Sequence, residues 1–184
     1  HEIKQGLLKA LHKMRPKVHG VRVNLGHKLA FAEACARFGV PTPAILAFAR
    51  RGGFYLGIAH LETFSGGIFV KPELGRGARG ARAHRRTETG LYRLGTRRAV
   101  KLDRLIAAIM RRSFVRPLIV QPLLENHPDI RDLAGTALIS FRVFTCIDPN
   151  GIPRVTHAML RSLSKLEPDW PGGEEFAAPV DLAT

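Results

Sequence analysis

The stretch from Ile68 to Gly80 constrains the fold of this chain more than any other part of the sequence. Three apolar residues lead into Lys71, and three glycines then follow within six positions, with arginines between them. Residues 81–87 alternate in polarity and lack the apolar stripe of a helix, so we expect a return strand after the loop. Two strands joined by a glycine loop form a hairpin whose backbone N–H groups can turn toward a phosphate.

The same glycines, Gly75, Gly77 and Gly80, also match the spacing of the dinucleotide-binding fingerprint. That fingerprint needs its first glycine at the end of the strand and a helix directly after its last glycine. Here residues 71–74 separate the strand from Gly75, and no helical pattern follows Gly80. The sequence therefore favours a flexible lid between two strands. The simpler alternative is a mobile basic hairpin tip without a ligand, since glycine and charged residues are common in turns.

The composition indicates a globular protein with a large excess of positive charge. Of 184 residues, 45% are hydrophobic, and 29 Lys and Arg against 15 Asp and Glu give a formal net charge of +14. Such a charge favours polyanionic partners, of which nucleic acid is the generic candidate. The aromatic residues do not alternate with basic ones as a platform for stacked bases requires, so we do not expect a nucleic-acid partner.

Neither a membrane segment nor a metal-binding cysteine motif is visible. No apolar run approaches the roughly 20 residues that a membrane span needs, so we expect no membrane partner. The two cysteines, Cys35 and Cys146, stand far apart without metal-ligand spacing. Isolated cysteines suit a reducing compartment, and the predicted location is the cytoplasm.

Apolar periodicity predicts helices over residues 4–14, 28–38 and 102–110, the second ending at Gly39. We expect a strand at Leu118–Val120, while residues 44–68 read as short strands or as a strand with a short helix.

The clearest hairpin joins residues 137–147 to 152–163 through a four-residue turn, Asp148–Gly151. In its first strand we expect one face to point to the core, namely Ile139, Phe141, Val143, Thr145 and Ile147. The tail from Glu167 to Ala178 is rich in Pro, Gly and acidic residues and is expected to be loop.

Several sequence features occur along the chain in an order that is typical of one protein superfamily. Lys28 opens a helix, Lys71 precedes the glycine loop, and an amphipathic helix comes next. Then come Gln-Pro-Leu-Leu-Glu-Asn-His-Pro at 121–128 and Arg-Val-Phe-Thr at 142–145. Over nearly its whole length this order resembles the ATP-grasp superfamily, and more narrowly the sugar-transfer-associated ATP-grasp group, relatives of the alpha-L-glutamate ligase-like proteins.

The resemblance implies an α+β fold, the ATP-grasp fold, in which two lobes of mainly antiparallel sheet with helices clasp ATP. The N-terminal helical segment would cover residues 1–43 and the small lobe with the glycine lid residues 44–120. Residues 121–184 would form the second lobe, which we expect to be incomplete.

The resemblance also implies roles for individual residues. Lys28 and Lys71 would contact the nucleotide phosphates, and the three lid glycines would cover them. An ordinary helix start is the alternative for Lys28. The hinge between the lobes would contain Gln121, Leu123 and Leu124, and the backbone groups of Leu123 would suffice to read the adenine edge.

Further polar residues would complete the site. One residue of the set Glu125, Asn126, His127 and Asp129 would face the ribose, although His127 can equally cap a turn. Arg142 would point toward the transferred phosphate or the carboxylate substrate, unless it is simply an exposed residue on its strand. Arg161 on the returning strand is a further candidate for the same charge cluster.

The implied activity is ATP-dependent ligation of small carboxylate and amine substrates. ATP would phosphorylate a carboxylate to an acylphosphate, and an amine or another nucleophile would displace the phosphate. Members of the superfamily hold Mg²⁺ through late acidic residues, typically with a Glu-x-Asn pair, which is missing from the end of this sequence. We therefore expect the Mg²⁺ ligands to lie beyond Thr184 and residues 1–184 to be inactive alone.

Two alternative functions stay open. One is a basic module that binds nucleic acid or another polyanion, as the net charge suggests. The other is a degenerate ATP-grasp domain that only binds nucleotide.

Overall fold

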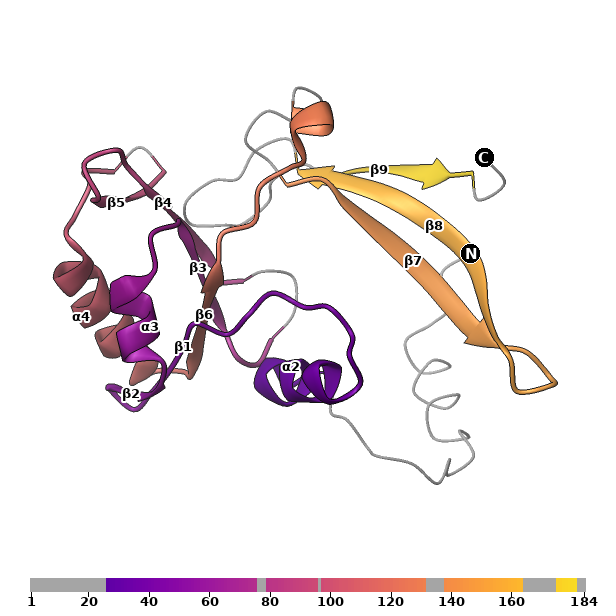
Figure 1. The fold of residues 1–184 in the computed structure, drawn as a ribbon, viewed down its shortest axis with the longest axis horizontal. Coiled ribbons are helices and arrows are strands. Elements are labelled where there is room, and N and C mark those ends of the chain that lie inside the picture. Colours follow the sequence, from indigo (N-terminus) through magenta and orange to yellow (C-terminus); the bar gives the residue numbers. More distant parts are fainter. Residues whose placement is uncertain (1–25, 76–78, 96, 132–137, 164–174, 182–184) are drawn as a thin grey trace.

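The computed structural model describes residues 26–75, 79–95, 97–131, 138–163 and 175–181. These residues form two antiparallel sheets and a few helices, so the predicted α+β class with mainly antiparallel sheet is confirmed (Figure 1). The helix expected over residues 4–14 lies outside the described residues, as does Gly77.

The larger sheet has six strands, and β6 lies at its centre. All of its neighbouring strands are antiparallel. Residues Leu118 to Gln121 of β6 are buried, which explains why this strand reads as a compact apolar run. In spatial order the strands are β2 (Gly53–Leu56), β1 (Ala47–Arg50), β6 (Leu118–Pro122), β3 (Ile68–Pro72), β4 (Arg82–Arg86) and β5 (Tyr92–Leu94).

The hydrophobic core lies between one face of this sheet and two helices. Helix α3 (Ile58–Thr63) and helix α4 (Leu102–Ser113) lie on the same side of the sheet, and α2 (Lys28–Arg37) lies on the other (Figure 1). The amphipathic pattern of α4 is confirmed, because its buried residues face this core. The core includes Ala47, Ala49, Leu61, Ile68, Val70, Tyr92, Leu105, Ile109, Leu118 and Val120.

The ambiguous region 44–68 forms β1, β2 and α3. At the turn between the two strands, Arg51 and Gly52 have φ values of +50° and +79°. Positive φ at both central residues is typical of a type I′ hairpin turn. The hydroxyl of Ser113 accepts the N–H of Gly52 at 2.9 Å and donates to the carbonyl of Met110 at 2.7 Å, so it ties this turn to the end of α4.

The glycine stretch joins two antiparallel strands, as predicted. Residue Ile68 of β3 lies opposite His84 of β4, and Val70 lies opposite Arg82. The chain enters β4 two residues after Gly80, and no helix begins there, so the geometry of a dinucleotide-binding turn is excluded.

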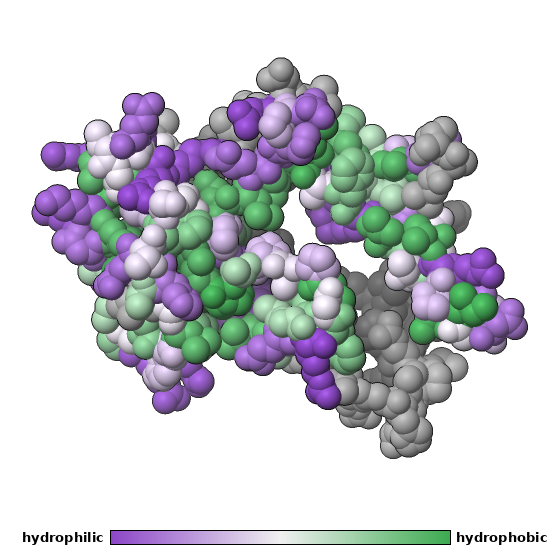
Figure 2. All heavy atoms as spheres, in the orientation of Figure 1, coloured by the Kyte–Doolittle hydropathy of each residue, from purple (hydrophilic) through white to green (hydrophobic). Residues whose placement is uncertain are grey.

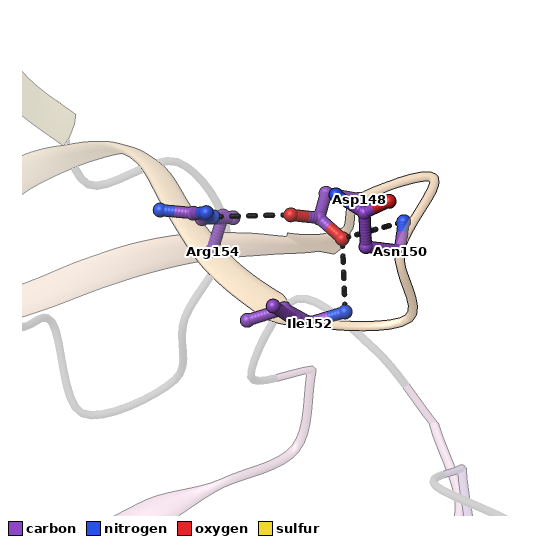
Figure 3. Close-up of polar contacts among 4 residues, drawn as sticks. All are labelled: Asp148, Asn150, Ile152 and Arg154. Carbon is purple, nitrogen blue, oxygen red and sulfur yellow. Dashed lines mark hydrogen bonds and ion pairs between the residues drawn. The ribbon is translucent and has the colours of Figure 1, made fainter.

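The predicted hairpin at Asp148–Gly151 is also confirmed (Figure 3). The N–H of Gly151 donates to the carbonyl of Asp148 at 2.9 Å, which closes the turn. The carboxylate of Asp148 accepts the N–H groups of Ile152 and Asn150, each at 2.9 Å, and the Nε of Arg154 at 3.2 Å. The bond from Ile152 is the main cause that lowers the pKa of Asp148.

This hairpin belongs to a second sheet, whose strands are β7 (Ser140–Ile147), β8 (Pro153–Leu163) and β9 (Glu175–Val180). The prediction that residues 167–178 are loop is wrong from Glu175 onward, because this segment pairs with the outer edge of β8. Proline is tolerated at position 179 because β9 is an edge strand. Residues 164–174 lie outside the described residues.

The prediction that one face of β7 points into a core is wrong for the described residues. Phe141, Val143 and Ile147 are 60%, 54% and 71% exposed. The face that holds Phe141 and Val143 does gather apolar residues, with Leu160 opposite Phe141 and Ala178 opposite Leu160. Figure 2 shows hydrophobic side chains at the surface of this sheet. Alternation identifies residues that share a face, but it does not show whether another layer covers them.

Two glycines with similar backbone conformations provide a test of this packing. Gly57 has φ +71°, and a Cβ there would overlap the carbonyl oxygen of Leu46, whereas Gly39 has φ +66° and open space around it. We expect Gly39→Ala to lower the free energy of unfolding by about 1 kcal/mol through backbone strain alone. Gly57→Ala should cost about 1–3 kcal/mol more, because β1 must shift. Urea denaturation would measure both values, and equal losses would contradict this packing.

Candidate functional site

The candidate site lies on the face of the six-stranded sheet that points away from α4. Along β3, Ile68 and Val70 point into the core, so Phe69 and Lys71 project from the opposite face. Lys71 lies opposite Ile119, and Phe69 lies opposite Gln121. The predicted phosphate lysine and the first hinge residue therefore share one face.

Lys28, the first residue of α2, reaches the segment that follows β3. Its Nζ donates to the carbonyl oxygens of Glu73 at 3.0 Å and Gly75 at 3.1 Å. Its backbone N–H also points to the carbonyl of Glu73, at 3.4 Å. These bonds fix the Lys28 ammonium group at the point where the glycine loop begins.

The fold brings the two predicted lysines close enough to influence each other. Burial lowers the pKa of Lys71, and the positive charge of Lys28 lowers it further. Burial also lowers the pKa of Lys28, while the carboxylate of Glu73 acts in the opposite direction. The Nζ of Lys71 lies 5.8 Å from the centre of the Phe69 ring, within reach of a cation–π contact. Two partly buried ammonium groups at the start of a glycine loop favour an anion beside them.

Two residues that were not predicted from the sequence hold Lys28 in place. The Nδ1 of His27 accepts the N–H of Ala30 at 3.3 Å and caps α2. Its Nε2 lies 3.1 Å from Oε1 of Glu73, whose side chain is only 6% exposed. Because Nδ1 accepts, the imidazole proton lies on Nε2 and is donated to this carboxylate. A histidine before a helix and an acid two residues after Lys71 were the only sequence signals.

Two glycines of the described part of the loop have backbone conformations that other residues rarely adopt. Gly75 has φ +121° and Gly80 has φ +74°, conformations that favour glycine. These two residues therefore flank the loop as points where the chain can turn.

The predicted hinge is held by contacts within the protein. The side-chain Nε2 of Gln121 donates to the carbonyl of Pro43 at 2.8 Å, so it secures the linker that follows α2. The backbone N–H of Leu123 donates to the carbonyl of Gly67 at 2.8 Å. This N–H is therefore already bonded to the residue before β3. The next backbone N–H along the hinge belongs to Leu124, an exposed residue. Any adenine contact of Leu123 would therefore use its carbonyl group.

The four ribose candidates take different structural positions. His127 caps the short 3₁₀ helix Pro128–Ile130, and its Nδ1 lies 3.4 Å from Oδ2 of Asp129. The side-chain oxygen of Asn126 accepts the N–H of Ile139 at 2.8 Å, which links the hinge segment to the start of the second sheet. Glu125 is exposed.

The two predicted arginines share a face of the second sheet. Arg142 of β7 lies opposite Met159, and Arg161 of β8 lies opposite Ser140, so the arginines are diagonal neighbours. Arg142 is exposed and Arg161 is half-buried. The candidate lysines therefore lie with α2 and β3, and the candidate arginines lie on the second sheet, which Figure 1 shows apart from the larger sheet.

In the part of the chain that the structure describes, no group of three or more His, Cys, Asp or Glu side chains could hold a metal ion. None of the helices described is both long and apolar enough to cross a membrane.

Comparisons with models of known protein families, with curated proteins and with solved structures found no match for this chain. The resemblance to ATP-grasp proteins therefore stays a prediction.

The proximity of the two lysines can be tested by removing one of them. We expect Lys28→Met to raise the pKa of Lys71, because a neighbouring positive charge disappears. NMR titration of ¹³C-labelled lysine side chains would follow this change. Lys101→Met is the matched control, because Lys101 is an exposed lysine at the start of α4. If both variants leave Lys71 titrating as in the unmodified protein, the two lysines do not form one site.

Proposed function

We propose that this chain is the ATP-binding part of an ATP-dependent carboxylate–amine ligase of the ATP-grasp type, which acts through an acylphosphate. The observation that carries the proposal is the convergence of Lys28 and Lys71 at the start of the glycine loop. Mutual repulsion and burial disfavour this arrangement, and a bound polyphosphate would relieve the repulsion.

The contacts of Lys28 suit a phosphate ligand. An ammonium group has three N–H donors. Two of them are directed at the carbonyls of Glu73 and Gly75, so the third can donate to a phosphate oxygen. The His27–Glu73 pair would keep Lys28 in this position, and the hairpin between β3 and β4 would cover the phosphates as a lid.

The remaining parts of the nucleotide would lie along the same face. Phe69 offers a half-buried ring beside Lys71, and the hinge offers the carbonyl of Leu123 and the backbone of Leu124 to the adenine edge. Arg142 and Arg161 would bind the carboxylate substrate or the transferred phosphate, since guanidinium groups match the geometry of both anions.

The proposed chemistry needs positioning and charge neutralisation and no covalent protein nucleophile. Bound ATP would supply the phosphoryl group for the acylphosphate. The residues described here do not gather the acids of a Mg²⁺ site, and we assign no step to a metal ion.

Substitution of one lysine should distinguish specific ATP binding from the nonspecific attraction of ATP to a basic protein. We expect Lys71→Ala to weaken ATP binding about 10- to 100-fold, because a charge-assisted hydrogen bond contributes about 1.5–3 kcal/mol. Lys101→Ala removes the same charge from an exposed position and should change binding less than about 2-fold, as expected for a surface charge. Isothermal titration calorimetry of both variants with ATP would measure these effects.

Other outcomes would point to the alternatives. Equal losses in both variants, together with DNA or RNA binding that falls steeply with salt, would favour a polyanion-binding module. Lysine-dependent ATP binding that never leads to ADP release in the complete gene product would favour a degenerate nucleotide-binding domain. ADP release by residues 1–184 would contradict the expectation that they are inactive alone.

A further inference from the structure

A second group of cations surrounds the far end of the glycine loop. The Nη2 of Arg112 donates to the carbonyl of Gly80 at 2.7 Å. The guanidinium group of Arg116 packs so closely on Gly80 that a Cβ at this position would overlap it. Arg82 follows two residues later at the start of β4. Arg112 and Arg116 therefore both reach Gly80, where the loop rejoins the sheet, and Arg82 lies on the adjoining strand.

This group is separate from the two lysines of the proposed ATP site. Arg82 lies opposite Val70, and His84 lies opposite Ile68, and both of these β3 residues point into the core on the α4 side. Lys71 projects from the other face of β3. The arginines and the lysines therefore lie on opposite faces of the same hairpin.

The surroundings of His84 provide independent evidence that Arg82 and Arg112 are close together. His84 is 7% exposed. Burial lowers its pKa to about 4, and the charges of Arg112 and Arg82 contribute in the same direction. His84 is therefore neutral at pH 7 and adds no charge to the group.

Two of these contacts also have a structural role. Basic residues in the last turn of a helix interact favourably with its dipole, which explains Arg111 and Arg112 at the end of α4. The bond from Arg112 to Gly80 secures the loop.

We propose that Arg82, Arg112 and Arg116 form a second anion site, which binds a phosphate group where the glycine loop meets β4. Guanidinium groups present paired N–H donors that match phosphate oxygens. Arg82 and Arg112 are half-buried and Arg116 is exposed, so the site is open to solvent on one side. This inference does not depend on the proposed ligase function.

Inorganic phosphate is the probe, and Arg116→Ala is the test variant because Arg116 is exposed and its loss should not unfold the chain. We expect saturable binding by calorimetry, weakened about 10-fold or more in Arg116→Ala, in line with the loss of a charged hydrogen bond. Arg82→Gln should weaken it similarly. Arg111→Ala is the control. Arg111 is an exposed arginine in the last turn of α4, next to Arg112 but outside the proposed site, so its loss should change binding less than about 2-fold. Phosphate can also bind beside the two lysines, so all of these variants are compared in a Lys71→Ala background.

A second measurement follows the site directly. NMR titration of His84 should show a higher pKa in the presence of phosphate, because the anion offsets the charges of Arg112 and Arg82. An unchanged pKa of His84 would overturn the proposal. So would the absence of saturable phosphate binding, or an Arg111→Ala variant as weak as Arg116→Ala. Binding only to oligonucleotides, with a steep dependence on salt, would indicate a diffuse basic surface and would likewise overturn it.

Discussion

The pairing of β6 with strands on both of its edges is the constraint on which the rest of the structure depends. β6 joins β1 and β3, which come much earlier in the chain, and its residues Leu118 to Gln121 are buried. Its register places Ile119 opposite Lys71 and Gln121 opposite Phe69. Pro122, which has no N–H to donate, is the last residue of this strand. The hinge segment therefore leaves the sheet beside Gly67 and Ile68, at the end of β3 away from Lys71.

A second constraint comes from the buried carboxylate of Glu73. A charged group this far from solvent needs hydrogen-bond partners, and His27 provides one from the residue before α2. The same segment accepts both side-chain bonds of Lys28 through its backbone carbonyls. One short stretch after β3 thus positions the helix, the lysine and the start of the glycine loop together. These three features meet only because the fold joins segments far apart in sequence.

Much of the local structure could be predicted from the sequence, because local signals determine it. Gly39 follows the end of α2, and Asp148 closes its turn through hydrogen bonds to Asn150 and Ile152, two and four residues later. The positions of the candidate lysines were also predicted, with Lys28 at the start of a helix and Lys71 near the end of a strand. His27, Glu73 and the arginine group at Gly80 were not, because their roles come from contacts across the sheet. β9 was missed for a similar reason, since its pairing with β8 overrides a composition typical of loops.

The contrast between the two sheets has a consequence for how the chain folds. β7 and β8 meet through a four-residue turn, so their hairpin can form on a timescale of about 1–10 μs. β6 must instead pair with β1, whose partner residues lie 69 to 73 positions earlier, and closing such a long loop slows folding. We expect the hairpin to form first and to wait for the larger sheet. During that interval its exposed phenylalanine and valine side chains and β7, an edge strand among the described residues, are available to other unfolded chains. Refolding yield should therefore fall as protein concentration rises.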